Sequence, residues 1–275
     1  MKFSLLAWLV LGLVACGGAP TVTELPPPTA VTVGESLFSL APLGADLMVE
    51  VDLRRLRDNP VVGSVLSTMA PPPSPTSYDL LQLADAALLC VYDIGGAAKQ
   101  LVILRSSQEL GGGAVLLGKG LYAVGDADLV KRSEGIQSAA QTMAADTGLL
   151  RLRAGVMPEK AESASLRLAA RLDFDARVAI AAKVAVSDVP VSIAVWADVV
   201  DDLALVANLA TEDEGDAPRL ERAIVGLRHI LAKGRLVRYL GLAKPVRDAR
   251  VTRSSEGVQV VFLSLIHISE PTRLC

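Results

Sequence analysis

The sequence is poor in the residues that most often carry enzyme chemistry. Its 275 residues include two histidines and three cysteines, and aromatic residues make up only 4% of the chain. No internal stretch reaches the ~20 uninterrupted apolar residues that a membrane-spanning helix needs. The net charge is −3 and no cluster of basic residues offsets it, so nothing indicates nucleic-acid binding. Arg54, Arg55 and Arg57 lie close together but alternate with leucine, which predicts a solvated face at the end of a strand.

What the chain does contain is aliphatic. Hydrophobic residues make up 51% of it and charged residues 21%, values typical of a globular protein rather than a disordered one. A chain of this length can bury a core as one large domain or as two modest ones.

The N-terminus has the features of an export signal. A positive start, Met1 and Lys2, precedes an apolar run from Phe3 to Leu13 that is too short to span a bilayer, so residues 1–15 are predicted to be a cleaved signal peptide. The next residues, Leu13-Val14-Ala15-Cys16, resemble the lipobox of bacterial lipoproteins. In that family the peptide is cut before the cysteine, whose sulfur takes a diacylglycerol and whose new amino group takes a further acyl chain such as palmitate. An ordinary secretory signal, with Cys16 a bystander, is the alternative.

The resemblance implies a location and a partner. Several acyl chains on Cys16 would anchor the protein stably to a membrane of the cell envelope. Gly17 stands where an aspartate would favour the inner membrane in that family, so the outer membrane, facing the periplasm or the exterior, is favoured. Residues 16–36 are rich in proline and threonine and are predicted to be a flexible tether.

The other end of the chain has a different resemblance. Residues 263–273 match, letter for letter, a one-frame translation of the transposon-end adapter used in sequencing libraries. Residues 263–275 are therefore predicted to be non-native, with the native sequence cut off near Phe262. His267 and Cys275 would then be artefacts, leaving His229 and Cys90. A genuine strand ending in a Ser-Glu-Pro-Thr turn is the alternative.

The first half of the remaining chain alternates strand and turn signals. Residues 45–53 alternate in polarity and predict a half-buried strand. A hairpin is expected around Gly95 and Gly96, and another, over residues 114–124, around Gly118-Lys119-Gly120. Asp126 is expected to cap a helix carrying Leu129 and Val130, and residues 136–145 to continue helically.

The second half follows a comparable order. Residues 149–154 predict a strand, residues 159–186 a mostly helical segment broken near Asp173, and residues 189–197 and 203–210 two further strands. Asp216 and Gly234 are expected to bound an amphipathic helix, and residues 249–262 to form a hairpin. The apolar stripe of that helix comprises Leu220, Ile224, Leu227 and Leu231.

These elements show no strict strand–helix–strand alternation, so an α+β fold with a mainly antiparallel sheet and flanking helices is favoured. The similar order of elements is consistent with two similar modules, residues 37–147 and residues 148–262, the second truncated at its C-terminus.

None of the motifs that suggest catalysis or cofactor binding is complete. The segment from Gly113 to Lys119 resembles a phosphate-binding loop, but Gly120 replaces the required serine or threonine and a hairpin explains the glycines better. His229 is expected at the surface or boundary of its helix, and Cys90 as a small buried residue. A Cys90–His229 catalytic pair is the alternative.

The acidic clusters also have simpler explanations. The run from Glu212 to Asp216 lacks the alternating ligands of a calcium loop and precedes a helix, whose positive end attracts acidic residues. Asp173 with Asp175, and Asp201 with Asp202, fit a helix start and a turn. The sequence therefore predicts no catalytic residue, no metal ligand and no cofactor.

Three functions remain open. The first is a non-catalytic envelope lipoprotein that binds or scaffolds another envelope protein. The second is a carrier or sensor of an apolar ligand, suggested by the aliphatic, aromatic-poor composition. The third is a hydrolase without a recognisable motif, which would need Asp173, Asp175, His229 or Cys90 to converge.

Overall fold

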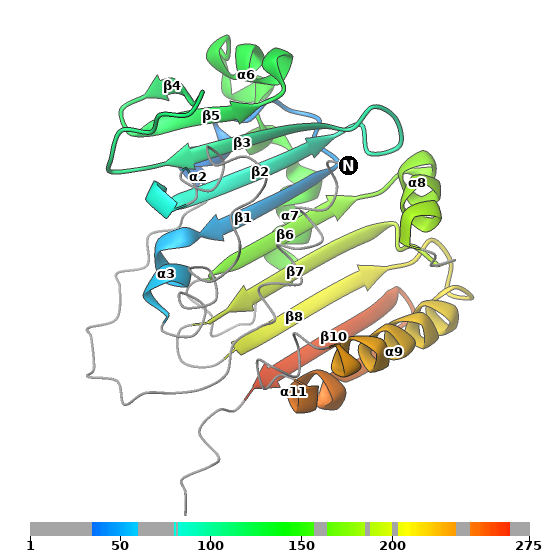
Figure 1. The fold of residues 1–275 in the computed structure, drawn as a ribbon. Coiled ribbons are helices and arrows are strands. Elements are labelled where there is room, and N and C mark those ends of the chain that lie inside the picture. Colours follow the sequence, from blue (N-terminus) through cyan, green and yellow to red (C-terminus); the bar gives the residue numbers. More distant parts are fainter. Residues whose placement is uncertain are drawn as a thin grey trace, which may run out of the picture.

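The structure, a computed structural model of the chain, describes residues 35–59, 80, 82–156, 164–184, 188–199, 203–234 and 243–264. The signal peptide, Cys16 and nearly all of the predicted tether lie outside these residues. The described part has an α+β fold, as predicted, built on one ten-stranded sheet with antiparallel neighbours (Figure 1). The strands are β1 (Leu47–Asp52), β2 (Ala86–Tyr92), β3 (Lys99–Arg105), β4 (Val115–Gly118), β5 (Leu121–Gly125), β6 (Leu166–Arg171), β7 (Ser192–Asp198), β8 (Leu203–Ala210), β9 (Arg250–Arg253) and β10 (Gly257–Ser264).

Helices flank this sheet on both faces. The α-helices of the described part are α2 (Glu35–Phe38), α3 (Leu53–Asp58), α6 (Ala127–Glu134), α7 (Thr147–Gly155), α8 (Phe174–Val184), α9 (Ala217–Lys233) and α11 (Ala243–Asp248). Two short 3-10 helices, η1 (Ala139–Gln141) and η2 (Met143–Ala145), stand where residues 136–145 were expected to be helical.

The strand order is the same in the two halves of the sheet. Across the sheet the order is β4-β5-β3-β2-β1-β6-β7-β8-β10-β9. β1 and β6 therefore pair at the centre, and each half continues outward with its second, third, fifth and fourth strands. The sheet is continuous across this central pair, and α7 crosses the predicted module boundary at residue 148. That boundary stays a prediction.

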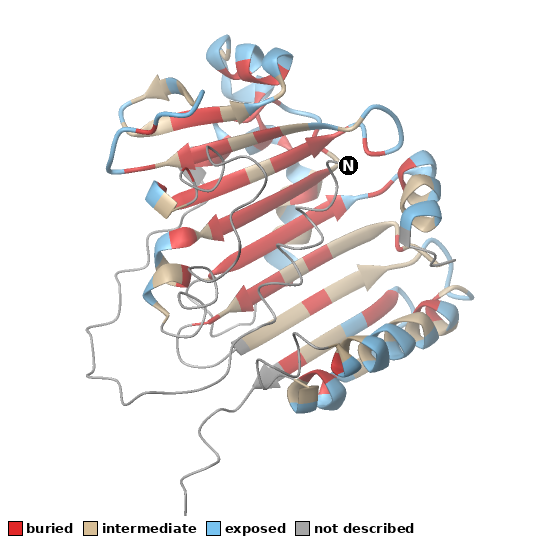
Figure 2. Ribbon diagram, viewed as in Figure 1, coloured by how far each residue is buried: buried red, intermediate tan, exposed pale blue. Residues whose placement is uncertain are grey.

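Each face of the sheet buries its own core. On one face Met48, Leu88 and Ile103 are fully buried beneath α2, α6 and α7. On the other, Val49, Ala170 and Phe262 pack with residues of α3, α8, α9 and α11. Figure 2 shows that burial is greatest in the central strands and declines toward β8. β9, at the edge of the sheet, is mostly exposed.

Strand β1 is buried on both faces, so the predicted half-buried strand is wrong in this respect. Glu50, on the face expected to be solvated, is only 5% exposed. The reason is tertiary, because helices cover both sides of the sheet centre and leave no solvent face there.

Two other predictions are wrong for related reasons. Residues 166–171, expected to be helical, form β6, because a strand buried on both faces needs no alternation of polarity. Residues 149–154, expected to be a strand, belong to α7, whose N-terminus is capped by the Asp146 carboxylate accepting a hydrogen bond from Leu149 N at 3.0 Å.

The local signals of turns and helix ends are confirmed more often. Both glycine hairpins form, as β2–β3 and β4–β5, and the last two strands form the hairpin β9–β10. Asp126 precedes α6 as expected, although its carboxylate accepts a hydrogen bond from Gln100 N rather than capping the helix. Asp173 starts α8 by accepting a hydrogen bond from Ala176 N at 2.8 Å.

Strand β10 extends two residues beyond the predicted native end. Leu263 and Ser264 pair with Ala204 and Leu203 of β8, while residues 265–275 lie outside the described part. Strand pairing uses main-chain groups that every residue except proline supplies, so it does not depend on the origin of these two residues. The adapter origin of the tail stays a prediction.

Gly95 allows the first half of the chain to contact α8 of the second. A Cβ at this position would lie 2.7 Å from Cβ of Asp175 and 2.8 Å from N of Ala176. We expect Gly95→Ala to lower the free energy of unfolding by about 2 kcal/mol, because the backbone of α8 cannot move aside as a side chain would. Urea unfolding measures the change.

The matched control is Gly111→Ala. A Cβ at Gly111 would meet nothing within 4 Å, so this variant should unfold at the wild-type urea concentration or slightly above it. Equal midpoints for the two variants would contradict the contact between Gly95 and α8.

Candidate functional site

Cys90 is buried in β2, which confirms the prediction that it packs as a small hydrophobic residue. Burial raises the pKa of its thiol to about 12, and the nearby charge of Glu50 acts in the same direction. The thiol therefore stays protonated near neutral pH and is a poor nucleophile.

His229 is exposed on α9, in agreement with the expected surface position. This helix packs through Leu231 and Ala232 into the core on one face of the sheet, whereas Cys90 belongs to the core on the other face. The sheet separates the two side chains, so they do not form a catalytic pair.

Three of the acidic residues that were candidates for a site are engaged in a helix start or an ion pair. Asp173 caps α8, Glu212 pairs with Arg177 at 2.7 Å, and Asp216 lies 2.5 Å from Arg219. Asp201 and Asp202 lie outside the described residues. Within the described ranges, no group of three or more His, Cys, Asp or Glu side chains is placed to hold a metal ion.

The segment that resembles a phosphate-binding loop is a hairpin. β4 and β5 pair across it, and Gly120 takes the left-handed conformation of a tight turn, with φ of +69°. No helix follows directly, so the backbone amides do not form the phosphate cradle of such loops.

The most concentrated buried charge lies at the centre of the sheet. Glu50 on β1 stands opposite Arg167 on β6, and Arg153 of α7 reaches down to the same carboxylate. Arg153 donates from Nη2 to Glu50 Oε2 at 2.9 Å and also from Nε to Oε1. The Glu50 side chain is 6% exposed and that of Arg153 14%.

A second contact holds the same arginine. The Cζ atom of Arg153 lies 5.2 Å from the ring centroid of Phe38 in α2, within the range of a cation–π interaction. Arg153 therefore joins α7, α2 and β1. We call Glu50, Arg153 and Arg167 the central ion cluster.

The central ion cluster carries two positive charges and one negative charge. Burial lowers the pKa of Arg167, the charge of Arg153 lowers it further, and Glu50 opposes the shift. The charges of the cluster are closed to solvent and already paired with one another. They therefore suit the positioning of α7 on the sheet better than contact with a substrate.

This cluster could not be predicted from the sequence because Glu50 lies more than a hundred residues from both arginines. One signal was present: Glu50 stands between two valines, and a carboxylate that becomes buried there needs a partner. The identity of that partner depends on α7, which was predicted to be a strand.

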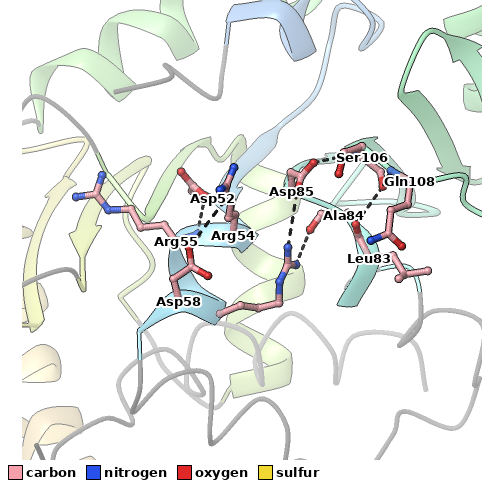
Figure 3. A network of polar contacts seen from close by, with 11 residues as sticks. Asp52, Arg54, Arg55, Asp58, Leu83, Ala84, Asp85, Ser106 and Gln108 are labelled. Atoms are coloured by element: carbon pink, nitrogen blue, oxygen red, sulfur yellow. Dashed lines mark hydrogen bonds and ion pairs between the residues drawn. The ribbon is translucent and has the colours of Figure 1, made fainter. Parts of the chain in front are cut away.

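A second polar network fastens α3 to both halves of the sheet. Figure 3 shows the part of it that involves the first half, around Ala84 and Asp85. Arg55 donates to Asp198 of β7 at 3.0 Å, and Asp198 also accepts from the Ser165 hydroxyl at 2.8 Å. Arg57 turns the other way, donating to the carbonyl of Ala84 and forming an ion pair with Asp85.

The prediction that Arg54, Arg55 and Arg57 form a solvated face is therefore wrong for two of the three. The Arg54 side chain is exposed and lies 3.9 Å from the carboxylate of Asp58, which is also exposed. Arg55 and Arg57 are mostly buried, because α3 begins directly after β1 and lies against the sheet end, where carboxylates from both halves reach it.

Exposed apolar side chains gather on two helices of the second half. α8 presents Phe174 and Val178, and α9 presents Val225, Leu227 and Ile230. Leu227 was expected in the buried stripe of its helix but is 48% exposed, because α9 packs over the sheet edge through a narrower face.

Comparisons with known protein families, curated proteins and solved structures found no match for this chain. No helix among the described residues is both long enough and apolar enough to cross a bilayer.

Proposed function

We propose that this chain is a lipid-anchored protein of the cell envelope whose α+β domain binds or scaffolds another envelope protein without catalysing a reaction. The observation that carries the proposal is the lipobox, Leu13-Val14-Ala15-Cys16, directly after a short apolar run. The proposed anchor is the set of acyl chains on Cys16, and Gly17 favours the outer membrane.

The polar groups of the domain support a non-catalytic task. The Cys90 thiol is buried with a raised pKa, His229 lies on the other side of the sheet, and the central ion cluster is closed to solvent. The ion cluster holds α7 and α2 on the sheet, which is a structural use of its charges.

The direct test is Cys16→Ser in a bacterial host that is fed an alkyne analogue of palmitate. We expect the wild-type chain to carry the label and to appear in the outer-membrane fraction of the cells. The variant should lose the label by about tenfold or more and retain its signal peptide, because the cut requires the lipidated cysteine.

Cys90→Ala is the matched control, because it removes a thiol that is buried in the domain. This variant should keep both the label and the membrane fraction. Equal labelling of wild-type and Cys16→Ser chains would overturn the proposed anchor. Loss of the label from Cys90→Ala would show that Cys90, and not Cys16, carries the lipid.

A further inference from the structure

The outer face of α9 combines basic and apolar side chains. Leu227 and Ile230 are exposed along one flank of the helix, Ile230 at 68%. Arg222 and Lys233 are exposed beside them, with His229 between. Basic residues next to an apolar flank are the pattern of helices that lie in the headgroup region of a bilayer.

The same face lacks carboxylates. Glu221 is the single acidic residue of α9, and it turns toward the sheet, where Arg253 of β9 lies 3.3 Å from it. Leu220 and Ala232 fill the buried side of the helix, and Arg228 donates to the carbonyl of Ala249. Along the helix itself the outward charge is therefore positive, although Asp213 and Glu214 are exposed just before its N-terminus and the chain as a whole is negative.

α8 differs in where its carboxylates lie. Its exposed apolar residues, Phe174 and Val178, stand beside the exposed Asp175, whereas Leu227 and Ile230 lie more than ten residues from the acidic run before α9. Negative charge repels anionic lipid, so this apolar surface does not share the character of the α9 face.

We propose that the outer face of α9 is a second membrane contact, which lies on the headgroups of a bilayer containing anionic phospholipid. The inference rests on the proposed function in one respect: the acyl chains on Cys16 hold the bilayer within reach. Residues 16–34 separate that anchor from α2 and can extend to at most ~68 Å, so α9 can reach the surface.

The positive charge and the exposed apolar area of the outer face of α9 both favour a lipid bilayer as its binding partner. Arg222 and Lys233 match lipid phosphates, and Leu227 and Ile230 add apolar area for the boundary with the acyl chains. One interfacial helix binds weakly by itself, but the anchor raises its effective concentration at the surface and makes the contact persistent.

The test places a tryptophan on the proposed contact. Ile230→Trp is prepared in the full lipidated chain and mixed with vesicles of phosphatidylcholine and phosphatidylglycerol that carry brominated acyl chains, which quench tryptophan at short range. Leu116→Trp is the matched control, because Leu116 is 62% exposed on β4, at the opposite edge of the sheet from α9 (Figure 1). Trp196 is buried and contributes the same background to both.

We expect the quenching at position 230 to exceed that at position 116 by at least about twofold. It should fall when phosphatidylglycerol is omitted or salt is raised, because the basic residues act through charge. Arg222→Gln and Lys233→Gln, each combined with Ile230→Trp, should weaken the contact of α9 with the bilayer by about fivefold, read from the lower quenching at position 230.

Quenching of similar size at both positions would overturn the proposal, and so would the absence of quenching at both. If neither position is quenched, a protein becomes the better candidate partner for the outer face of α9. Failure of the anchor is distinguished by the alkyne-palmitate label, which tests the acyl chains independently of α9. The difference in quenching between positions 230 and 116 tests α9, because any membrane attachment elsewhere in the chain is the same in both variants.

Discussion

Replacing Glu50 with glutamine is expected to lower the free energy of unfolding by about 3 kcal/mol, because it removes the single negative charge of the central ion cluster. Arg153 and Arg167 would remain buried with like charges and no carboxylate between them. Glutamine keeps the volume of the side chain and one acceptor, so the loss reports charge rather than packing. Urea unfolding with an unchanged slope measures it.

The control for this variant is an ion pair at the surface. Lys99 and Asp128 approach to 2.6 Å, but both side chains are about half exposed, so Asp128→Asn should leave the unfolding midpoint nearly unchanged. Similar midpoints for Glu50→Gln and Asp128→Asn would contradict a buried, charge-balancing role for Glu50.

Removing one arginine of the central ion cluster should lower the free energy of unfolding less than removing the carboxylate does. Arg153→Met leaves Glu50 opposite Arg167, one charge of each sign, and keeps an apolar side chain over Phe38. We therefore expect this variant to unfold at a higher urea concentration than Glu50→Gln. The opposite order would mean that the link from α7 to the sheet matters more than the charge balance.

Asp198→Ala is expected to lower the free energy of unfolding by about 2 kcal/mol, because its carboxylate joins three groups at the seam between the halves. One oxygen accepts from Arg55 of α3, and the other accepts from the Ser165 hydroxyl and from Val199 N at 2.9 Å. Arg55 is only 14% exposed, so its charge would be left without this carboxylate in a mostly dry environment.

A double-mutant cycle isolates this contact. Arg55→Ala, Asp198→Ala and the combined variant should show a coupling energy above about 1 kcal/mol. Arg54→Ala with Asp58→Ala provides the same cycle on the same helix for an exposed pair, and its coupling should be close to zero. Equal coupling in the two cycles would show that Arg55 and Asp198 do not fasten α3 to the second half.

Local chemistry accounts for the elements that could be predicted from sequence. The hairpins at Gly95 and Gly120 follow from the conformational freedom of glycine in tight turns. Asp126, Asp173 and Asp216 each precede a helix, since an acidic residue suits the positive end of the helix dipole. The α+β class followed from the irregular order of these elements, and the described structure confirms it.

The centre of the sheet could not be predicted in this way. β6 has the composition of a helix and α7 the alternation of a strand. β6 forms because it pairs with β1 at the centre of the sheet, and α7 packs over β6 and β7. Glu50 and Arg55 find their partners more than a hundred residues away, in α7 and β7. Such pairs depend on strand order, which no local pattern encodes.

The sequence by itself determined the hairpins, the helix starts, the scarcity of catalytic residues and the lipobox that places a lipid on Cys16 in our proposal. These features depend on neighbours a few residues apart, which turn chemistry, capping and recognition motifs require. Only the tertiary structure decided that β1 and β6 meet at the centre, that Glu50 balances two arginines, and that α9 turns its basic and apolar side outward. Each of those features depends on strand pairing and on helix packing against the sheet. These contacts join residues that are distant in the chain and bury them from water.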